Sequence, residues 1–198
     1  MKNLKRSIVA VVIAAICFMT SGVNIYASEW YTPLIRAEVP EKEAKISKLI
    51  EDGMLTQEEF DFYLEYGFYI KDVCSKYDDI DPILIASIIE TESWFTPDIE
   101  NASHHVGLMQ VSRKWSKPYM KKLGCTDLLD PFQNILVGVD MFDAWLQMAD
   151  GNIELALMCY NQGYESAIAS YRKGVSTYAK TILERTERLH EVEESFKK

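Results

Sequence analysis

Apolar residues recur at helical spacing along most of the chain, and no segment alternates between apolar and polar positions as a half-buried strand does. The clearest segment runs from residue 82 to about 94, where isoleucine, leucine and alanine cover nearly the whole circumference. A helix with no polar face is expected at the centre of a core. Asp81 and Pro82 predict its start, because aspartate caps free amides and proline suits the first turn.

The same kind of pattern predicts further helices on both sides of this one. Thr56 and Glu59 have the spacing of a capping box, which predicts a helix from there towards residue 77. Asp130-Pro131 repeats the Asp-Pro start and predicts a helix that ends at Gly151-Asn152. The remaining helices are expected over residues 41–52, 153–161 and 165–172, and from 177 onward. The pattern therefore predicts an all-α fold.

The first 27 residues differ from the rest. Three basic residues precede an uninterrupted apolar run from Ile8 to Met19. A run of about 12 apolar residues suits an export signal and falls short of the ~20 that span a bilayer. We therefore expect residues 1–27 to be a signal peptide, cut after Ala27, that exports the protein. An uncleaved N-terminal anchor is the alternative, and in either case this segment is the expected contact with a membrane.

Composition and charge exclude some classes of function. A chain of 198 residues, 48% of them hydrophobic, suits one packed domain better than two. Its formal net charge is −9, and the part after residue 27 carries 18 basic and 30 acidic residues, because the first 27 contain three basic residues and no acidic ones. No lone basic patch stands out, so nucleic acid is not an expected partner.

The residue types that bind metals are poorly placed for it. Cys17 lies in the expected signal peptide, so three cysteines remain after it: Cys74, Cys125 and Cys159. They are odd in number and lack CxxC spacing, so free buried thiols are expected, with one disulfide and one free thiol as the alternative. His104 and His105 are adjacent but have no third ligand at useful spacing. We therefore expect no metal site, and the histidines are expected to be exposed in a loop or to contact a ligand.

Two carboxylates lie at the end of the apolar helix. Glu90 and Glu92 are about 200° apart around its axis, so they cannot share one site. Glu92 lies in the last turn, near the negative end of the helix dipole and beside Trp94 and Phe95, and both effects favour the neutral acid. A carboxyl group that donates a proton at neutral pH needs such a setting. Glu90 is expected to be structural or solvated; the alternative places both acids on the surface.

The segment from Glu92 reads ESWFTPDIENASHHVGLMQ and resembles the signature of the soluble lytic transglycosylases, relatives of goose-type lysozyme. Glu92-Ser93, Phe95, Pro97 and GLMQ at 107–110 follow that pattern without insertion or deletion, whereas the loop departs from it at Ile99, Asn101 and His104-His105. Three further features follow in order. These are the DPFQNILVG segment at 130–138, the LALMCYNQG segment at 155–163, and Tyr178.

The resemblance implies a lysozyme-like helical fold of the goose-type and transglycosylase kind. It runs from about Ile70 to Leu189, so we expect a catalytic domain over residues 70–198 and an N-terminal extension with short helices over 28–69. It implies that Glu92 is the single catalytic acid, and Tyr160 is chemically suited to hydrogen-bond its carboxyl group. The residues implied to bind the glycan are Ser93, Met109, Gln110, Tyr160, Asn161 and Tyr178.

The implied activity is cleavage of the bond between N-acetylmuramic acid and N-acetylglucosamine in peptidoglycan, outside the cytoplasm. Glu92 would act as acid and then as base, closing a 1,6-anhydro ring, with neither a metal nor an organic cofactor. One alternative is goose-type hydrolysis, with Asp98 or Glu100 as the second acid; another is a non-catalytic wall-binding or scaffolding module. The resemblance also associates such enzymes with local wall opening for a secretion, conjugation or phage apparatus, and leaves these three open.

Overall fold

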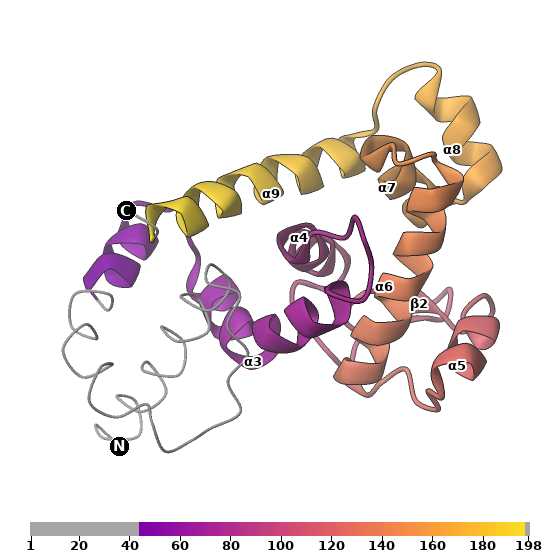
Figure 1. Cartoon of the computed structure of the whole chain (residues 1–198), viewed down its shortest axis with the longest axis horizontal. Helices are drawn as coiled ribbons and strands as arrows, with labels where there is room; N and C mark the ends of the chain where they lie inside the picture. Colours follow the sequence, from indigo (N-terminus) through magenta and orange to yellow (C-terminus); the bar gives the residue numbers. More distant parts are fainter. Residues whose placement is uncertain (1–43, 197–198) are drawn as a thin grey trace. The chain divides into compact units, whose positions relative to one another are not determined.

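The computed structural model describes residues 44–196 (Figure 1). The predicted signal peptide, residues 1–27, lies outside the described residues. Within the described range, no helix is both long and apolar enough to cross a membrane. The chain divides into two compact units: the larger is Tyr69–Glu187, and the smaller holds the described residues up to Phe68 and from Arg188 onward. Helices α3 (Gln57–Cys74) and α9 (Thr177–Ser195) contribute residues to both units.

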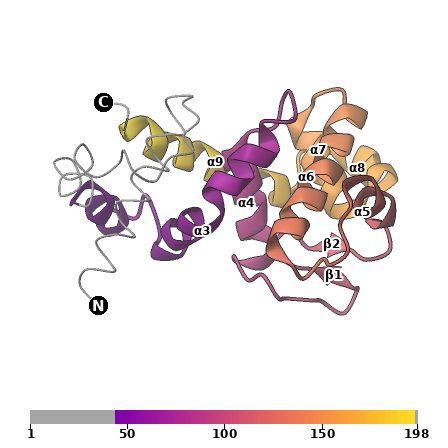
Figure 2. The ribbon, with the colours of Figure 1, turned by 60° about the horizontal axis from the view of Figure 1, so that its bottom comes forward.

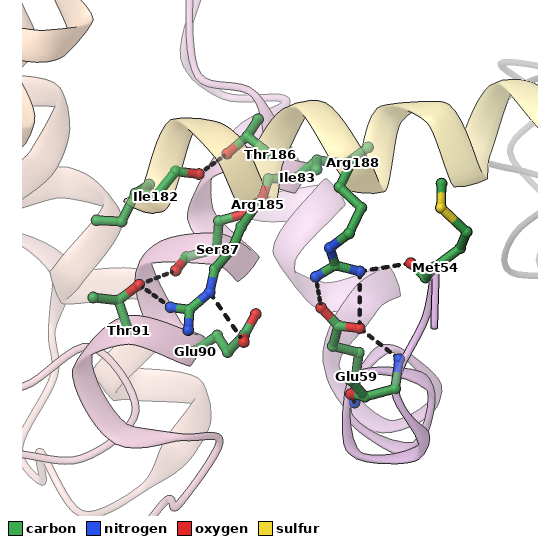
Figure 3. A network of polar contacts seen from close by, with 11 residues as sticks. Met54, Glu59, Ile83, Ser87, Glu90, Thr91, Ile182, Arg185, Thr186 and Arg188 are labelled. Carbon is green, nitrogen blue, oxygen red and sulfur yellow. Dashed lines mark hydrogen bonds and ion pairs between the residues drawn. The ribbon is translucent and has the colours of Figure 1, made fainter. Parts of the chain in front are cut away.

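The smaller unit confirms the predicted capping box. A helix over residues 44–51 ends before Gly53, and α3 then begins. The backbone N–H of Glu59 donates to the Thr56 hydroxyl (3.1 Å), while the Thr56 N–H donates to the Glu59 carboxylate (2.7 Å). Glu59 is fully buried and also pairs with Arg188 of α9, whose guanidinium donates to the Met54 carbonyl as well (Figure 3). This network fixes the start of α3.

The larger unit is built around α4 (Pro82–Ser93), seen nearly end-on in Figure 1. Nine of its 12 residues are buried, which confirms the prediction of a central helix. Helix α6 (Pro131–Met148) packs against α7 (Ile153–Gln162), and α7 packs against α8 (Tyr164–Tyr171). The largest fully buried side chains of this unit include Ile85, Ile88, Ile89, Leu108, Met109, Ile135, Phe142, Leu157, Met158 and Ile182.

The helix starts follow the local chemistry that the sequence indicated. The Asp81 carboxylate accepts the N–H of Ile83 at the start of α4, and Asp130 does the same for Gln133 at the start of α6. Both helices carry proline in the first turn, as predicted. Because these caps satisfy amides that have no partner inside the helix, they set the first residue of each helix.

The sequence pattern does not predict three short elements. Strands β1 (His105–Val106) and β2 (Val111–Ser112) form an antiparallel hairpin, and α5 (Lys117–Leu123) follows it (Figure 2). Two residues are too few for an alternation to be recognised. Helix α5 has no buried residue and contains Pro118 near its start, so it lacks the apolar stripe that identifies a surface helix. With strands this short the fold is helical, as predicted.

Candidate active site

The end of α4 places Glu92 in its last turn. Trp94 follows in the left-handed region (φ 50°), and its N–H donates to the Glu90 carbonyl (3.0 Å). Phe95 also has a positive φ of 62°. Two successive non-glycine residues in this region are uncommon and cost conformational energy. The helix therefore stops abruptly, directly after the residue expected to be the acid.

Glu92 receives a short hydrogen bond from the last helix. The Tyr178 hydroxyl on α9 donates to Oε1 of Glu92 at 2.5 Å. Burial raises the pKa of Glu92 above its ordinary value, and the bond from Tyr178 opposes that rise. Burial and the charge of Glu92 raise the pKa of Tyr178 well above its usual range, so Tyr178 remains a neutral donor. Burial outweighs the bond, so Glu92 holds its proton to a higher pH than an exposed glutamate does.

Tyr160 makes a different contact from the one expected. Its hydroxyl donates to the Met109 carbonyl at 2.7 Å, so the phenol that donates to Glu92 is that of Tyr178. The two tyrosines are chemically equivalent, and spacing along the chain does not say which helix faces the acid. Tyr160 still lies within the electrostatic influence of Glu92, because the charge of Glu92 adds to burial in raising the pKa of Tyr160.

The GLMQ segment is the turn of the β hairpin, and α6 holds it in place. Gly107 has φ 73°, and a Cβ there would lie 2.4 Å from Nδ2 of Asn134. The buried Asn134 side chain accepts the N–H of Met109 (2.8 Å) and donates to the carbonyls of Val106 (2.7 Å) and Leu128 (2.9 Å). Glycine and asparagine therefore allow the turn to lie directly against the helix.

Three residues implied to bind the glycan have buried side chains. Met109 lies against Gly138, where an added Cβ would be 2.4 Å from the Met109 sulfur. The Gln110 amide donates to the Gly107 carbonyl (3.0 Å), and the Ser93 hydroxyl donates to the Ile89 carbonyl (3.1 Å). The contacts of Met109 and Gln110 hold the turn of the hairpin, and that of Ser93 lies in the last turn of α4. Of the other implied residues, Asn161 is exposed, while Tyr160 and Tyr178 are half-buried.

Glu90 has a separate partner that the sequence did not reveal. It is buried, and Nε of Arg185 lies 3.1 Å from its Oε1 (Figure 3). Arg185 also donates to the Thr91 hydroxyl (2.6 Å), and its guanidinium lies 5.3 Å from the centre of the Trp94 ring. Glu90 is thus structural, as expected. Arg185 follows Tyr178 by seven residues, a spacing that returns to the same face of a helix and would have indicated its direction.

Glu100, in the loop after α4, is bound by residues before and after the hairpin. The Arg113 guanidinium contacts both oxygens of Glu100 (3.1 and 2.9 Å), and Nδ1 of His104 lies 3.0 Å from one of them. These partners lower the pKa of Glu100 to about 2. In the part of the chain that the structure describes, no group of three or more histidine, cysteine, aspartate or glutamate residues could hold a metal ion. Cys74, Cys125 and Cys159 are free thiols, of which Cys125 is only half-buried.

The fold matches those of two lytic transglycosylases of known structure. It superimposes on the 70 kDa soluble lytic transglycosylase of Escherichia coli with a TM-score of 0.58 and 18% identity, covering 77% of this chain and 29% of that one. It also superimposes on an inactive glutamate-to-glutamine variant of the lytic transglycosylase Slt from Pseudomonas aeruginosa. That match has a TM-score of 0.53 and 18% identity, and it covers 80% of this chain and 27% of that one. The predicted lysozyme-like helical fold of the transglycosylase kind is confirmed.

Sequence comparison then identifies the family. Residues 70–184, more than half of the chain, match the profile described as "Transglycosylase SLT domain". A transglycosylase of Enterobacteria phage PRD1 is 33% identical over 89 residues, which cover 45% of this chain and 32% of the phage protein. The chain belongs to the SLT-domain transglycosylase family, as predicted. It spans about a third of the length of that phage relative and less than a third of the two enzymes of known structure.

Proposed function

We propose that the protein is an exported peptidoglycan lytic transglycosylase and that Glu92 is its catalytic acid. One observation carries the proposal: Glu92 is a half-buried carboxyl group whose pKa is raised by burial and whose hydrogen-bond donor is a neutral phenol, that of Tyr178. Such a group remains protonated to a higher pH than an ordinary glutamate. Membership of the SLT family supplies the substrate class.

In the proposed reaction, Glu92 donates its proton to the oxygen that joins N-acetylmuramic acid to N-acetylglucosamine. The bond between this oxygen and C1 of the muramic sugar breaks, and the glucosamine leaves with a free 4-hydroxyl. The substrate's own N-acetyl group stabilises the positive charge at C1, which spares the enzyme a second carboxylate. Glu92, now ionised, takes the proton of the C6 hydroxyl, and O6 closes on C1. The proton balance is restored and no water is consumed.

The other residues take supporting parts in this proposal. Tyr178 holds Glu92 by its hydrogen bond, and Tyr160 anchors the hairpin through the Met109 carbonyl. Asn161 is exposed and suits an amide-bearing sugar. Buried Met109 and Gln110 shape the turn from within. Export through residues 1–27, with action at the cell wall, belongs to the proposal, and service to a secretion, conjugation or phage apparatus stays a prediction.

Hydrolysis by a second acid is the rival outcome. Glu100, one candidate, has a pKa of about 2 and is bound to Arg113, so it is a weak base for activating water. Asp98, the other candidate, is exposed in the same loop. The geometry around Glu100 therefore favours ring closure by the substrate's own hydroxyl.

Product analysis tests the proposal directly. Purified peptidoglycan sacculi are digested with the protein, and the soluble fragments are weighed by mass spectrometry. We expect products one water lighter than the hydrolytic fragments, released by the wild type and not by Glu92→Gln. Hydrated products would instead indicate a hydrolase, and equal release by both proteins would remove Glu92 from the reaction. Binding without release would indicate a non-catalytic wall module.

A further inference from the structure

Trp94 is an unusually exposed aromatic side chain, two residues after the proposed acid in the chain. Among the described residues it has the largest exposed fraction of any large apolar side chain, 71%. It is the second residue after Glu92, at the point where α4 ends. Exposing an indole in this way loses the favourable burial of a large apolar surface. Trp115 is exposed to a similar extent, so the contacts that restrain Trp94 are what distinguish it.

The structure holds this indole from one side. The Arg185 guanidinium lies over its ring, 5.3 Å from the centre, within the range of a cation–π contact. Arg185 is itself fixed, because Glu90 pairs with Nε (3.1 Å) and Thr91 accepts from Nη1 (2.6 Å). The arginine side chain is largely buried, so its position is set by α4 and α9 together.

The backbone restrains Trp94 as well. Its φ of 50° and the hydrogen bond from its N–H to the Glu90 carbonyl fix the direction in which the side chain leaves the helix. An aromatic ring restrained before binding loses little conformational entropy when a ligand arrives. A fixed, exposed ring face is a typical element of a ligand site.

We propose that Trp94 is a sugar-stacking site, with Arg185 as the residue that positions it. The ligand is a pyranose ring of the glycan strand, next to the bond that Glu92 cleaves; this rests on the function proposed above. Arg185 occupies one face of the indole, and the C–H bonds of the sugar pack on the other. The contact is apolar and uncharged, which suits a protein whose net charge of −9 gives it no general attraction to an anionic wall.

Trp115 provides a matched control. It is 64% exposed in the same unit, and it also has a cation over its ring, Nζ of Lys114 at 4.3 Å. Both residues of that pair are exposed on the segment that follows the hairpin, whereas Arg185 is held by Glu90 and Thr91. Trp115→Ala therefore removes a comparable exposed indole without changing the Trp94–Arg185 pair.

The test measures binding without turnover. Each substitution is made in full-length Glu92→Gln protein, and binding of the tetrasaccharide (GlcNAc-MurNAc)₂ is followed by calorimetry. We expect Trp94→Ala to raise Kd about tenfold, as expected for loss of a central aromatic contact. Trp94→Phe, which keeps a ring, raises it about threefold, and Trp115→Ala leaves it within twofold. Arg185→Lys keeps a charge beside Glu90 but loses the planar stack, so its Kd lies between those of the two Trp94 variants.

A kinetic readout separates this site from the acid. In otherwise wild-type protein, Trp94→Ala should raise KM for sacculi with kcat nearly unchanged, as expected when binding is lost equally in ground and transition states. A Kd for Trp94→Ala within twofold of the parent overturns the stacking site while leaving the proposed function intact. If the Glu92→Gln protein does not bind the tetrasaccharide and the wild-type protein releases no anhydro products, both proposals fall together.

Discussion

Glu92 and Glu100 are the same type of side chain eight residues apart, yet the fold gives them opposite electrostatic settings. Glu92 receives burial and a neutral phenol, and its pKa rises. Glu100 is exposed and receives Arg113 and His104, and its pKa falls to about 2. The difference shows that the neighbours, rather than the residue type, decide which carboxyl group keeps its proton to a higher pH.

A third glutamate sharpens the contrast. Glu90 is two residues from Glu92 and is buried, but it is paired with Arg185. The fold thus gives a guanidinium to each of the glutamates on either side of Glu92 in the chain, Glu90 and Glu100, and a tyrosine to Glu92. A nearby guanidinium would stabilise the ionised form and remove the proton that a general acid must donate.

The strongest test of this comparison is Glu92→Gln. Glutamine keeps the shape and can still accept the Tyr178 hydrogen bond, but it cannot donate an acidic proton. We expect the rate of glycan release to fall at least about 10³-fold, near the upper part of the range for general acid catalysis. Release of soluble fragments from purified sacculi measures this, with circular dichroism as the control for folding. A variant that keeps a tenth of the wild-type rate would contradict the assignment.

Asn134→Ala tests how firmly helix α6 holds the β hairpin. Its buried side chain satisfies three backbone groups, and Asn134→Ala leaves all three without that partner. We expect a loss of roughly 3 kcal/mol in the free energy of unfolding, since each buried unsatisfied group costs about 1–3 kcal/mol. Urea unfolding measures the change.

Gln133→Ala is the matched control for Asn134→Ala. Gln133 is the preceding residue of α6, and its side chain also accepts backbone N–H groups, those of Thr126 and Asp127. Those bonds are exposed to solvent, so we expect a loss below about 1 kcal/mol. Equal losses from the two substitutions would show that Asn134 does not hold the hairpin more firmly than a surface contact does.

The sequence predicted the helices where local chemistry decides them. Asp81 and Asp130 cap their helices, and Thr56 with Glu59 forms the capping box, because each acts on amides a few residues away. The apolar run also predicts the end of α4, and therefore that Glu92 lies in its last turn. Local caps and helical periodicity are thus sufficient for the helical fold, except for elements too short to show a period.

The partners of the candidate site were less accessible to sequence reasoning. Which tyrosine meets Glu92 depends on how α7 and α9 lie beside α4, and spacing along the chain does not encode that. The sequence pattern does not single out Arg185, because it predicts only that Glu90 is structural or solvated and indicates no cation beside it. The resemblance implies that the motif residues Met109 and Gln110 bind the glycan, which stays a prediction; the structure shows both side chains buried, with Gln110 bonded to the turn. A motif records which residues are needed without recording which way they face.

Tyr178→Phe tests the neutral partner of Glu92. The hydrogen bond from Tyr178 lowers the pKa of Glu92, so its loss leaves burial unopposed and the pKa rises. Because the acid must be protonated to act, activity falls as pH rises through this pKa. The alkaline limb of kcat/KM should therefore move to higher pH, while the maximal rate falls about tenfold through poorer positioning of the acid.

Tyr171→Phe is the control for that change. Tyr171 also donates to a glutamate, Glu154 at 3.1 Å, and it lies on α8. This variant should leave both the rate and the pH profile as in the wild type. A shift of the alkaline limb of Tyr178→Phe to lower pH would show that Tyr178 stabilises the protonated rather than the ionised form of Glu92.

Glu100→Gln is expected to have the smallest effect. The rate of glycan release should stay within about twofold of wild type, because a carboxylate bound to Arg113 is a weak base.

The same variant changes how stability depends on pH. The folded-state pKa of Glu100 is about 2, below the ordinary value near 4.3. Its contribution to stability is therefore present above pH 4.3 and disappears as pH falls through 2. The difference in Tm between wild type and variant should therefore shrink from pH 5 to pH 2.

A double-mutant cycle with Arg113→Gln completes the comparison. If the two side chains act on each other, the double variant should lose no more stability than either single variant. Added salt should reduce the loss of stability in each single variant, because the pair is exposed.

Loss of glycan release in Glu100→Gln at unchanged Tm would contradict the comparison and make Glu100 a catalytic base. The products of the wild type would then have to be hydrated, so the two carboxyl groups and the mass of the product decide the mechanism together.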